Sequence, residues 1–501
     1  MAKSKSSSFI VERRILTTKN DELFLDNKFQ ICHKIYNTSV KYYKKQVDIL
    51  YNDVWFTKCL HNFKNSKTKQ EQKLWRDEIF LCMKNYKLTE YDIHMFMGKQ
   101  KVSAFANGIG INIVQKLGSN LYSAIKKAVF KGTKIHYRKR GQTTSFEDKR
   151  ANSGIIYNND GTVKIMGKVM QLKPIRVKDH YLQEAMCNKI KYCRIVKKPF
   201  QNGYKYFLQI VMEGVAPKKL IMSKGLCGID QGTSTIAYYN NTELDFIVLA
   251  NGVETYNKEI KYWATVFDRR KRLNNPQCYK DDGTIIKDSK FLYTKNCKKA
   301  LMQLKNAYRK KSVYVKQEHN KLVNRLIEQC DTVIKEPMNF KALQKRSKNT
   351  SKQNKVSVIT KKDGTQLSIY KYKRKKRFGK SLQNRSPGLL NQIIKNKFQQ
   401  YNGFVIEVDS KEYKASQYNH ITQQATKSKL SERSKLIGEH LVQRDLYSAF
   451  LLYNMLNITE IDFHRCKQNF NDFLIKQELV VNKIKVIGDK TKNFGLKNFE
   501  C

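Results

Sequence analysis

Three acidic residues stand at the ends of apolar segments in the second half of the sequence. They are Asp230 in "GLCGIDQG", Glu336 in "DTVIKEP" and Asp445 in "RDLYSAFLLYNML". Read alone, Asp230 is explained by a strand-to-turn corner, where Asp and Gly are common. Read together, the three carboxylates are hard oxygen ligands of the kind that magnesium prefers. Two magnesium ions held in this way can activate a water on one side of a phosphodiester and stabilise the leaving oxygen on the other.

The segments that carry these residues follow one another in the order of a ribonuclease H-type fold. The order is three strands, a helix, a strand, a helix, a strand and a helix, expected at 226–232, 233–240, 244–252, 296–330, 331–340, 386–403, 404–410 and 444–456. In such a fold Asp230 ends the first strand, Glu336 ends the fourth, and Asp445 lies in the first turn of the last helix, beside the central strands. Three carboxylates at one sheet edge repel one another unless cations lie between them. The sequence therefore predicts two Mg²⁺ ions held by Asp230, Glu336 and Asp445.

The charge of the chain indicates its partner. There are 97 Lys and Arg residues against 43 Asp and Glu residues, a net charge of +54. Such an excess opposes folding through self-repulsion unless a polyanion neutralises it. Nucleic acid is the expected polyanion, because each neutralised phosphate releases counterions and adds affinity. A membrane partner is not expected, since no segment reaches the roughly 18 apolar residues of a spanning helix and the N-terminus lacks a signal peptide; we expect a cytoplasmic location.

The first half of the chain changes its hydrophobic period twice. Residues 8–17 alternate like a strand, and apolar residues then recur every three or four positions from 20 to 128, which indicates a helical domain. From 131 to 222 short β-type runs alternate with turn residues, which predicts a small β-barrel or sheet joined by the N-terminal strand. Tyr137 is expected in the core of that barrel. The whole chain is predicted to be a multidomain α+β protein.

Five motifs in the second half resemble a known family. "GIDQGTSTIA", "IKEPMNFKALQKRSK", "RKKRFGKSLQNRSPG", "EVDSKEYKASQYNH" and "QRDLYSAFLL" resemble the successive RuvC motifs of transposon-encoded RNA-guided nucleases (the TnpB group) and of miniature type V CRISPR effectors. The resemblance extends from about 223 to 455, and Asp230, Glu336 and Asp445 match the catalytic carboxylates of that family. The first half resembles the family only in layout, a helical recognition domain inserted in an oligonucleotide-binding-type (OB-like) wedge β-barrel.

The resemblance implies a function and a domain organisation. It implies an endonuclease that binds a guide RNA, recognises a short motif beside a double-stranded DNA target and cuts with one RuvC site, in antiviral defence or within a transposon. A monomer and a homodimer on each guide RNA are both open. The implied domains are a wedge strand at 1–19, a helical recognition domain at 20–130, the wedge barrel at 131–222, a RuvC nuclease domain at 223–410 with a basic insertion at 341–380, a lid region at 411–440 and a C-terminal RuvC part at 441–501.

One departure from the family concerns zinc. Relatives carry a zinc ribbon with paired CxxC motifs between the last two RuvC motifs, but the stretch from 411 to 440 has no cysteine. His420 and His440 are its only soft ligands, and two histidines do not make a four-coordinate structural site. The eleven cysteines of the chain form no CxxC and predict reduced thiols. We therefore expect no zinc, and a zinc-free loop that covers the active site.

Basic residues in three segments are candidates for contact with nucleic acid. The insertion at 341–380 carries fifteen Lys and Arg residues against one acid, Asp363, and such a block is either a solvated loop or a contact with guide and target backbones. Arg444 could touch the scissile phosphate or orient a carboxylate. The predicted contacts are Arg138, Lys139, Arg140, Arg269, Arg270, Arg272, Lys373, Arg374, Lys375, Lys376, Arg377 and Arg444.

Two other functions fit the same motifs. The first is a nuclease-inactive RNA-guided DNA-binding repressor of the same fold. The second is a RuvC-like transposase or resolvase that works without RNA. A copurifying structured RNA separates the second from guided proteins, and magnesium-dependent cleavage separates the first from nucleases.

Overall fold

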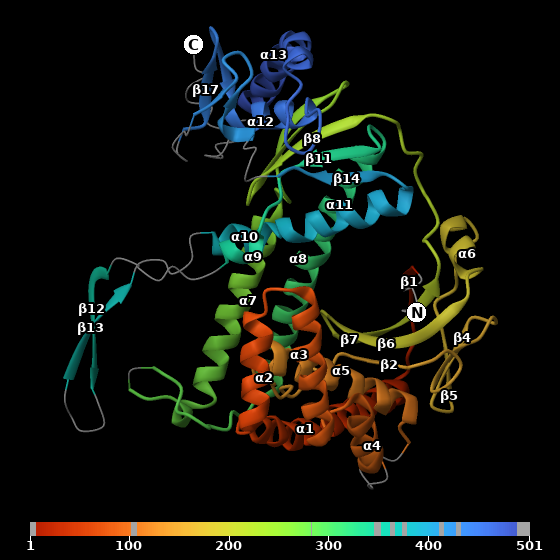
Figure 1. Ribbon diagram of the computed structural model, residues 1–501. Coiled ribbons are helices and arrows are strands. Elements are labelled where there is room, and N and C mark those ends of the chain that lie inside the picture. Colours follow the sequence, from red (N-terminus) through yellow and green to blue (C-terminus); the bar gives the residue numbers. More distant parts are fainter. Residues whose placement is uncertain are drawn as a thin grey trace. The chain divides into compact units, whose positions relative to one another are not determined.

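The computed structural model describes residues 7–101, 108–281, 283–344, 352–360, 366–372, 378–409, 415–426 and 432–487. The chain forms two compact units, Met1–Pro217 and Lys218–Cys501. Each unit contains both helices and sheets (Figure 1), so the chain is a multidomain α+β protein as predicted. In the described part of the chain, no helix is both long enough and apolar enough to cross a membrane.

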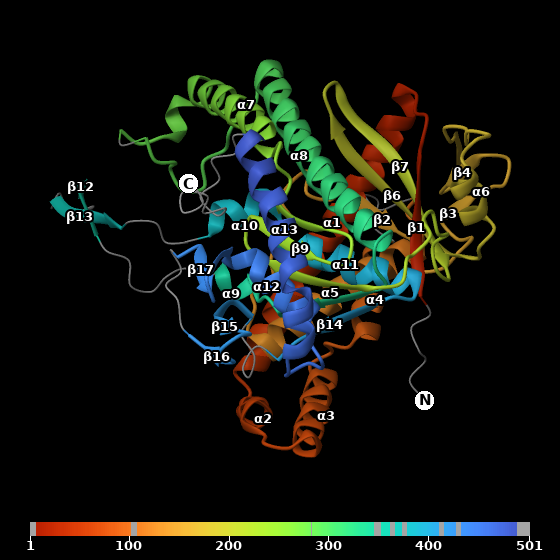
Figure 2. The ribbon, with the colours of Figure 1, turned by 90° about the horizontal axis from the view of Figure 1, so that it is seen from above.

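The first unit begins with one strand and then becomes helical. Its main helices are α1 (Lys19–Tyr51), α2 (Val54–Asn65), α3 (Lys69–Asn85), α4 (Glu90–Lys101) and α5 (Ile111–Lys131), and α2 and α3 run side by side (Figure 2). Helix α1 starts at a capping box, in which the Thr18 hydroxyl accepts from the Asp21 N–H and the Asp21 carboxylate accepts from the Thr18 N–H. This exchange satisfies two backbone donors that the first helical turn leaves open.

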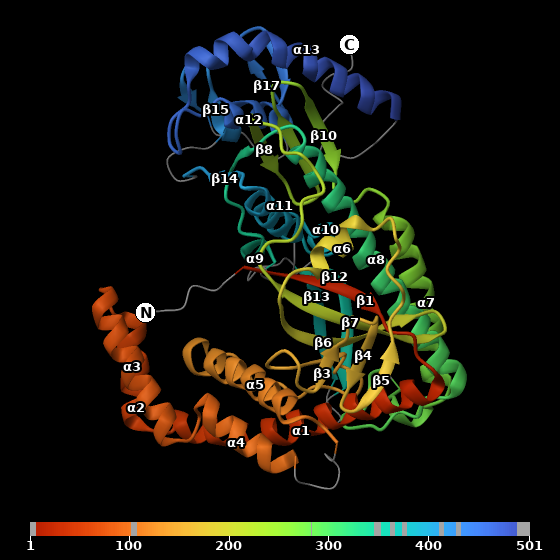
Figure 3. The ribbon, with the colours of Figure 1, turned by 90° about the vertical axis from the view of Figure 1, so that its right-hand side faces the viewer.

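The strands of the first unit form two sheets. One has the order β1-β7-β6-β2 and the other the order β3-β4-β5, both visible in Figure 3. Strand β1 pairs antiparallel with β7, so the N-terminal strand joins the later strands as predicted. The two sheets meet at a bridge between Ile15 and Leu172. The bounds are β1 (Ser8–Arg14), β2 (Ser145–Glu147), β3 (Ile155–Tyr157), β4 (Thr162–Ile165), β5 (Lys168–Gln171), β6 (Ile190–Phe200) and β7 (Gly203–Glu213), with α6 (His180–Met186) between β5 and β6.

One predicted strand is wrong. Within the described residues 108–281, no strand lies between α5 and β2, although "TKIHYRKRG" alternates like one. Helix α5 ends at Gly132 in the left-handed conformation, and the backbone of Arg138 then bonds to the side chain of Asn37 on α1 instead of to a neighbouring strand. Tyr137 is 49% exposed, so the prediction that it lies in a barrel core is also wrong.

The second unit is built on a five-stranded sheet of order β10-β9-β8-β11-β14. Strand β8 is antiparallel to β9 and parallel to β11, which is itself parallel to β14. The predicted succession of strands and helices is present, with an additional long helix, α7, after the third strand. The strands are β8 (Leu226–Gln231), β9 (Thr235–Tyr239), β10 (Leu244–Val248), β11 (Thr332–Lys335) and β14 (Phe404–Glu407).

Helices cover both faces of this sheet (Figures 1 and 3). On one face Ile229 and Ile236 pack against Leu326 of α8 and Phe398 of α11; on the other, Ala237 and Phe246 pack against α12 and α13. Helix α7 lies along α8 (Figure 2). The helices are α7 (Val253–Leu273), α8 (Lys295–Ile327), α9 (Phe340–Leu343), α10 (Gly379–Arg385), α11 (Pro387–Tyr401), α12 (Arg444–Tyr453) and α13 (Phe463–Ile487).

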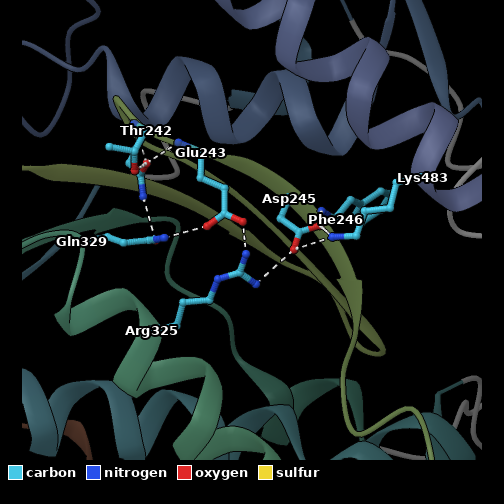
Figure 4. A network of polar contacts seen from close by, with 8 residues as sticks. Thr242, Glu243, Asp245, Phe246, Arg325, Gln329 and Lys483 are labelled. Atoms are coloured by element: carbon cyan, nitrogen blue, oxygen red, sulfur yellow. Dashed lines mark hydrogen bonds and ion pairs between the residues drawn. The ribbon is translucent and has the colours of Figure 1, made fainter.

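A polar network fastens the edge strand β10 to the helices on either side (Figure 4). The carboxylate of Asp245, whose side chain is 3% exposed, lies 3.3 Å from a guanidinium nitrogen of Arg325 on α8 and 3.3 Å from Nζ of Lys483 on α13. Arg325 also contacts Glu243, which in turn accepts from Gln329 at 2.6 Å. A buried carboxylate is costly unless it is paired and hydrogen-bonded, and here two helices supply the cations.

Short hairpins complete the second unit. Strands β12 (Lys352–Thr360) and β13 (Gln366–Tyr372) pair antiparallel inside the basic insertion. The lid region contains a 3-10 turn at Ala415–Gln417 and two small hairpins. These hairpins are formed by β15 (Tyr418–Asn419) with β16 (Gln424–Ala425), and by β17 (Ser434–Ile437) with β18 (His440–Gln443).

Candidate functional site

The register of two parallel strands brings Asp230 and Glu336 to the same level. Ile229 of β8 is the partner of Lys335 of β11, so the next residue on each chain is Asp230 and Glu336. Ile229 is buried on the face covered by α8 and α11. Because successive side chains alternate between the faces of a strand, Asp230 lies on the opposite face, the one covered by α12.

Helix α12 is pressed directly onto β8, and this brings Asp445 to the same place. A Cβ atom at Gly228 would lie 2.1 Å from the Ala449 carbonyl oxygen and 2.3 Å from the Tyr453 nitrogen. Only glycine permits this approach of helix backbone to strand. Asp445 stands in the first turn of α12, where the N-terminal end of the helix dipole favours a negative charge.

Asp230 is influenced electrostatically by the other two carboxylates. Burial, followed by the negative charges of Asp445 and Glu336, raises the pKa of Asp230 well above its usual range, while the Arg444 guanidinium acts in the opposite direction. Asp230 keeps some contact with solvent, although the atoms around its carboxylate desolvate it. Burial also raises the pKa of Glu336. The shift of Asp230 marks a place where negative charge accumulates without enough positive charge to balance it, whereas the rise at Glu336 reflects burial alone.

Asp445 is held by two arginines. The guanidinium of Arg444 lies 3.2 Å from its carboxylate and that of Arg433 lies 3.5 Å from it. Arg444 also donates to the carbonyl oxygen of Glu432 at 2.8 Å. Of the two roles open to Arg444 from the sequence, the structure therefore contains the carboxylate-orienting contact.

The segment 415–420 links Glu336 to α12. The Ala415 N–H donates to Oε1 of Glu336 at 2.9 Å. Five residues later the His420 N–H donates to the Tyr447 hydroxyl at 3.1 Å, and Nδ1 of the same histidine lies 2.7 Å from that oxygen. Burial lowers the pKa of His420 to about 4, with a smaller contribution from the charge of Lys467. A neutral histidine thus anchors the lid region to α12 through hydrogen bonds and packing.

This anchoring role was missed from the sequence, where His420 was weighed only as a zinc ligand. The ring packs against Phe450 and Phe470, whereas His440 is exposed and contacts Phe470 from a different hairpin. The position of His420, two residues after the aromatic residue Tyr418, was the one available signal of a buried role. His319, which the sequence suggested to be a packing or a solvent-exposed residue and not a catalytic one, is 1% exposed and contacts the Arg385 carbonyl.

Asp230, Glu336 and Asp445 are the residues predicted to hold magnesium. In the described part of the chain, no three His, Cys, Asp or Glu side chains are grouped so as to hold a metal ion. The donor chemistry nevertheless fits a hard divalent cation, because all three groups are carboxylates and the Arg444 guanidinium only partly offsets the negative charge around Asp230. The two arginines on Asp445 supply the nearest positive charge. The metal site stays a prediction, and it requires the carboxylates of Asp230, Glu336 and Asp445 to come closer to one another.

The predicted nucleic-acid contacts fall in three places. Arg138, Lys139 and Arg140 lie in the loop before β2, where Arg138 is partly buried and the other two are exposed. Arg269 is exposed on α7, whereas Arg270 donates to the Asn296 carbonyl and Arg272 pairs with Asp268. Lys373, Arg374, Lys375, Lys376 and Arg377 lie outside the described residues.

No protein-family model matches the sequence, and no curated protein matches it. Solved structures similar to this chain include a Cas12f1 chain determined by cryo-EM in a complex with sgRNA and target DNA. It shares 10% identity at a TM-score of 0.44, over 90% of this chain and 99% of the other. A second is a CRISPR-Cas12f ternary complex, with 11% identity and a TM-score of 0.30, over 90% of this chain and 100% of the other. Since both TM-scores lie below 0.5, the function proposed below rests on the residues of this chain.

Proposed function

We propose that this chain is an RNA-guided, magnesium-dependent DNA endonuclease with one RuvC-type site formed by Asp230, Glu336 and Asp445. The observation that carries the proposal is the raised pKa of Asp230 between two further carboxylates. Such an arrangement destabilises a folded protein unless a cation joins it, so its presence at the ends of adjacent parallel strands favours a role in binding metal.

The role of each group follows from its surroundings. Magnesium, when bound, supplies an activated water and stabilises the leaving oxygen of the phosphodiester. Asp230, Glu336 and Asp445 would hold it. The Ala415 N–H fixes the orientation of Glu336, and Arg444 fixes that of Asp445. Because Arg433 also contacts Asp445, this arginine must move away for the carboxylate to take a metal.

The proposal extends to partners and domains. The net charge of +54 favours a guide RNA and a double-stranded DNA target, because polyanions relieve its self-repulsion. The helices and strands of the first unit are assigned to a helical recognition domain inserted in a wedge barrel, and the second unit to the RuvC domain. The lid needs no zinc, since hydrogen bonds and packing at His420 anchor it. One or two copies of the chain act on each guide RNA.

The proposal is tested by cleavage with the full chain and its copurified RNA. The RNA is sequenced, a DNA target complementary to it is prepared, and cleavage is measured with and without magnesium. We expect cleavage only with magnesium and with matched RNA, and none from Asp230→Ala. The control is Asp281→Ala, which removes an exposed carboxylate distant in sequence from the three acids and should cleave like the unmodified chain.

The alternatives give different results in the same assay. Guided DNA binding without any magnesium-dependent cleavage would identify a repressor. Cleavage by a chain purified free of RNA would identify a transposase or resolvase. Unchanged cleavage by Asp230→Ala would overturn the assignment of the site itself.

A further inference from the structure

A cavity of about 260 Å³ lies in the first unit, between α5 and the loop that leads into β2. Ile113 and Leu117 form an apolar part of its wall, and Phe146 another. The remaining wall is polar and includes Lys116, Asn120, Arg138, Thr143 and Glu147. Its volume is just below the range of about 300 to 1,000 Å³ typical of small-molecule sites, so it suits one nucleotide-sized group and excludes a duplex.

Arg138 is held in position at this cavity by α1. The side chain of Asn37 accepts from the Arg138 N–H at 2.9 Å and donates to the Arg138 carbonyl at 2.8 Å. The guanidinium carbon lies 3.7 Å from the centre of the Tyr36 ring. The backbone of this arginine is therefore held by hydrogen bonds, and its guanidinium lies against the Tyr36 ring, before any ligand binds.

The guanidinium of Arg138 has hydrogen-bonding capacity to spare. No described residue accepts a hydrogen bond from it. Arg194 offers a contrast, because its guanidinium donates to both Glu147 and Gln209. Arg194 largely neutralises Glu147, which leaves Lys116 only a loose contact at 3.7 Å with that carboxylate. Lys116 also lies 5.4 Å from the centre of the Tyr192 ring, so the Arg138 guanidinium is the more available of the two positive charges at the cavity.

Neutral hydrogen-bonding groups line the opposite side. Thr143 is buried, and its hydroxyl lies 3.4 Å from Nδ1 of His33. Thr144, Ser145 and Asn120 are exposed at the cavity. Hydroxyls and amides can both donate and accept, so they suit the polar edge of a nucleobase.

We propose that this cavity binds one unstacked nucleotide of a single strand, with the base stacked on the Arg138 guanidinium opposite Tyr36 and the phosphate near Lys116. Stacking of unpaired bases on arginine planes is a general mode of nucleic-acid recognition, and arginine serves it better than lysine because its charged group is planar. The inference rests on the proposed function only in naming nucleic acid as the partner.

The test measures binding to the full chain without magnesium. The probes are oligouridylate RNA, oligothymidylate DNA and a DNA duplex, each of about 12 nucleotides or base pairs, within the usual range of single-strand site sizes. Arg138→Lys keeps the positive charge and removes the planar guanidinium group on which a base would stack. It should weaken binding of at least one single-stranded probe about fivefold or more and leave duplex binding within about twofold. If only the affinity for the RNA probe falls, the cavity is assigned to the guide RNA; if only the affinity for the single-stranded DNA probe falls, it is assigned to a target strand.

Two further variants protect the test against a folding defect. Asn120→Trp fills the cavity from the exposed side of α5 without changing charge, and should reproduce the loss seen with Arg138→Lys. Lys134→Gln removes an exposed positive charge just before the loop and outside the cavity wall, and should bind like the unmodified chain. Thermal unfolding checks that all three variants fold.

Equal weakening for the duplex, or no weakening for either single strand, would overturn the proposal. The cleavage assay with Asp230→Ala does not involve this cavity. A negative result in the binding assay therefore does not contradict the proposed nuclease function. A negative result in the cleavage assay likewise does not contradict the proposed nucleotide site in the cavity.

Discussion

Asp230 and Asp245 belong to the same five-stranded sheet, yet their surroundings differ. Asp245 on the edge strand β10 is the more deeply buried, and Arg325 and Lys483 reach it from two helices. Asp230 on the central strand β8 has no ion pair among the described residues, and its charged neighbours include Asp445 and Glu336. The fold therefore compensates one buried carboxylate with its own cations and leaves the other short of positive charge.

This difference separates a structural carboxylate from a functional one. Where a carboxylate only holds elements together, nearby arginine and lysine satisfy it, as at Asp245. Where it has to receive a cation from solution, a full set of internal partners would compete with that cation. Substitutions at the two aspartates should consequently affect different properties, one mainly cleavage and the other mainly stability.

The largest expected effect is that of Asp230→Asn on cleavage. Removal of this charge should slow cleavage on the order of a thousandfold or more, because metal binding and water activation both depend on it. The free energy of unfolding of the metal-free protein should stay the same or rise, since repulsion among the carboxylates falls. Cleavage kinetics and urea unfolding measure the two quantities. A strong loss of stability would place Asp230 with Asp245 as a structural carboxylate.

Gly228→Ala tests whether α12 must touch β8 for the site to exist. The added methyl group would overlap the backbone of Ala449 and Tyr453, so we expect a loss of about 3 kcal/mol in the free energy of unfolding. Cleavage should also fall, because α12 carries Asp445. The control is Gly388→Ala, because a Cβ atom at that position would meet only Phe340, at 3.8 Å, and should be tolerated. Gly161→Ala would not serve as a control, since Gly161 has a positive φ. Normal stability of Gly228→Ala would contradict the close packing.

Asp245→Ala should lower the free energy of unfolding by about 2 to 3 kcal/mol. The value is below the 3 to 5 kcal/mol expected for a fully buried pair, because Arg325 and Lys483 are half exposed and regain water when the carboxylate is removed. Lys483→Gln should cost well under half as much, since Arg325 remains. Cleavage per folded molecule should not change. Chemical denaturation and an active-site titration separate the two effects, and reduced cleavage by the folded fraction would contradict the purely structural role.

His420 extends the comparison to a buried group that stays neutral. Its pKa in the folded protein is about 4, below the usual value near 6.5, so the unfolded chain takes up a proton first as the pH falls. Stability is full above pH 6.5 and should decrease by about 2 kcal/mol between pH 7 and pH 5. His420→Phe should flatten this pH dependence, while His440→Phe, at an exposed position, should retain it. Unfolding at several pH values measures the slope, and an identical slope in His420→Phe would exclude His420 as its source.

The sequence predicted the elements of the candidate site better than its contacts. The strand that contains Asp230, the strand before Glu336 and the helix with Asp445 in its first turn are all present, because each has an apolar run bounded by turn residues. The additional helix α7 was not predicted, although its apolar residues recur every three or four positions, at Val253, Tyr256, Ile260, Trp263 and Phe267. The sequence therefore carried a helical signal here that was overlooked.

Errors and omissions arose where distant side chains decide local structure. Asn37 captures the backbone of Arg138 from a position far away in sequence, and alternation alone made that loop look like a strand. The partner of His420 is a tyrosine on another element, and Arg433, the second arginine on Asp445, comes from the lid. Such contacts depend on the packing of the chain and have no local sequence pattern.

The pairing of β1 with β7 has a consequence for the order in which the first unit folds. Residues 8–14 cannot complete their sheet until residues 207–213 have left the ribosome, roughly 10 to 40 seconds later at usual rates of synthesis. The helices α1 to α5 have local contacts and can form during that interval. The N-terminal strand must therefore wait, unpaired with β7, while the helices form.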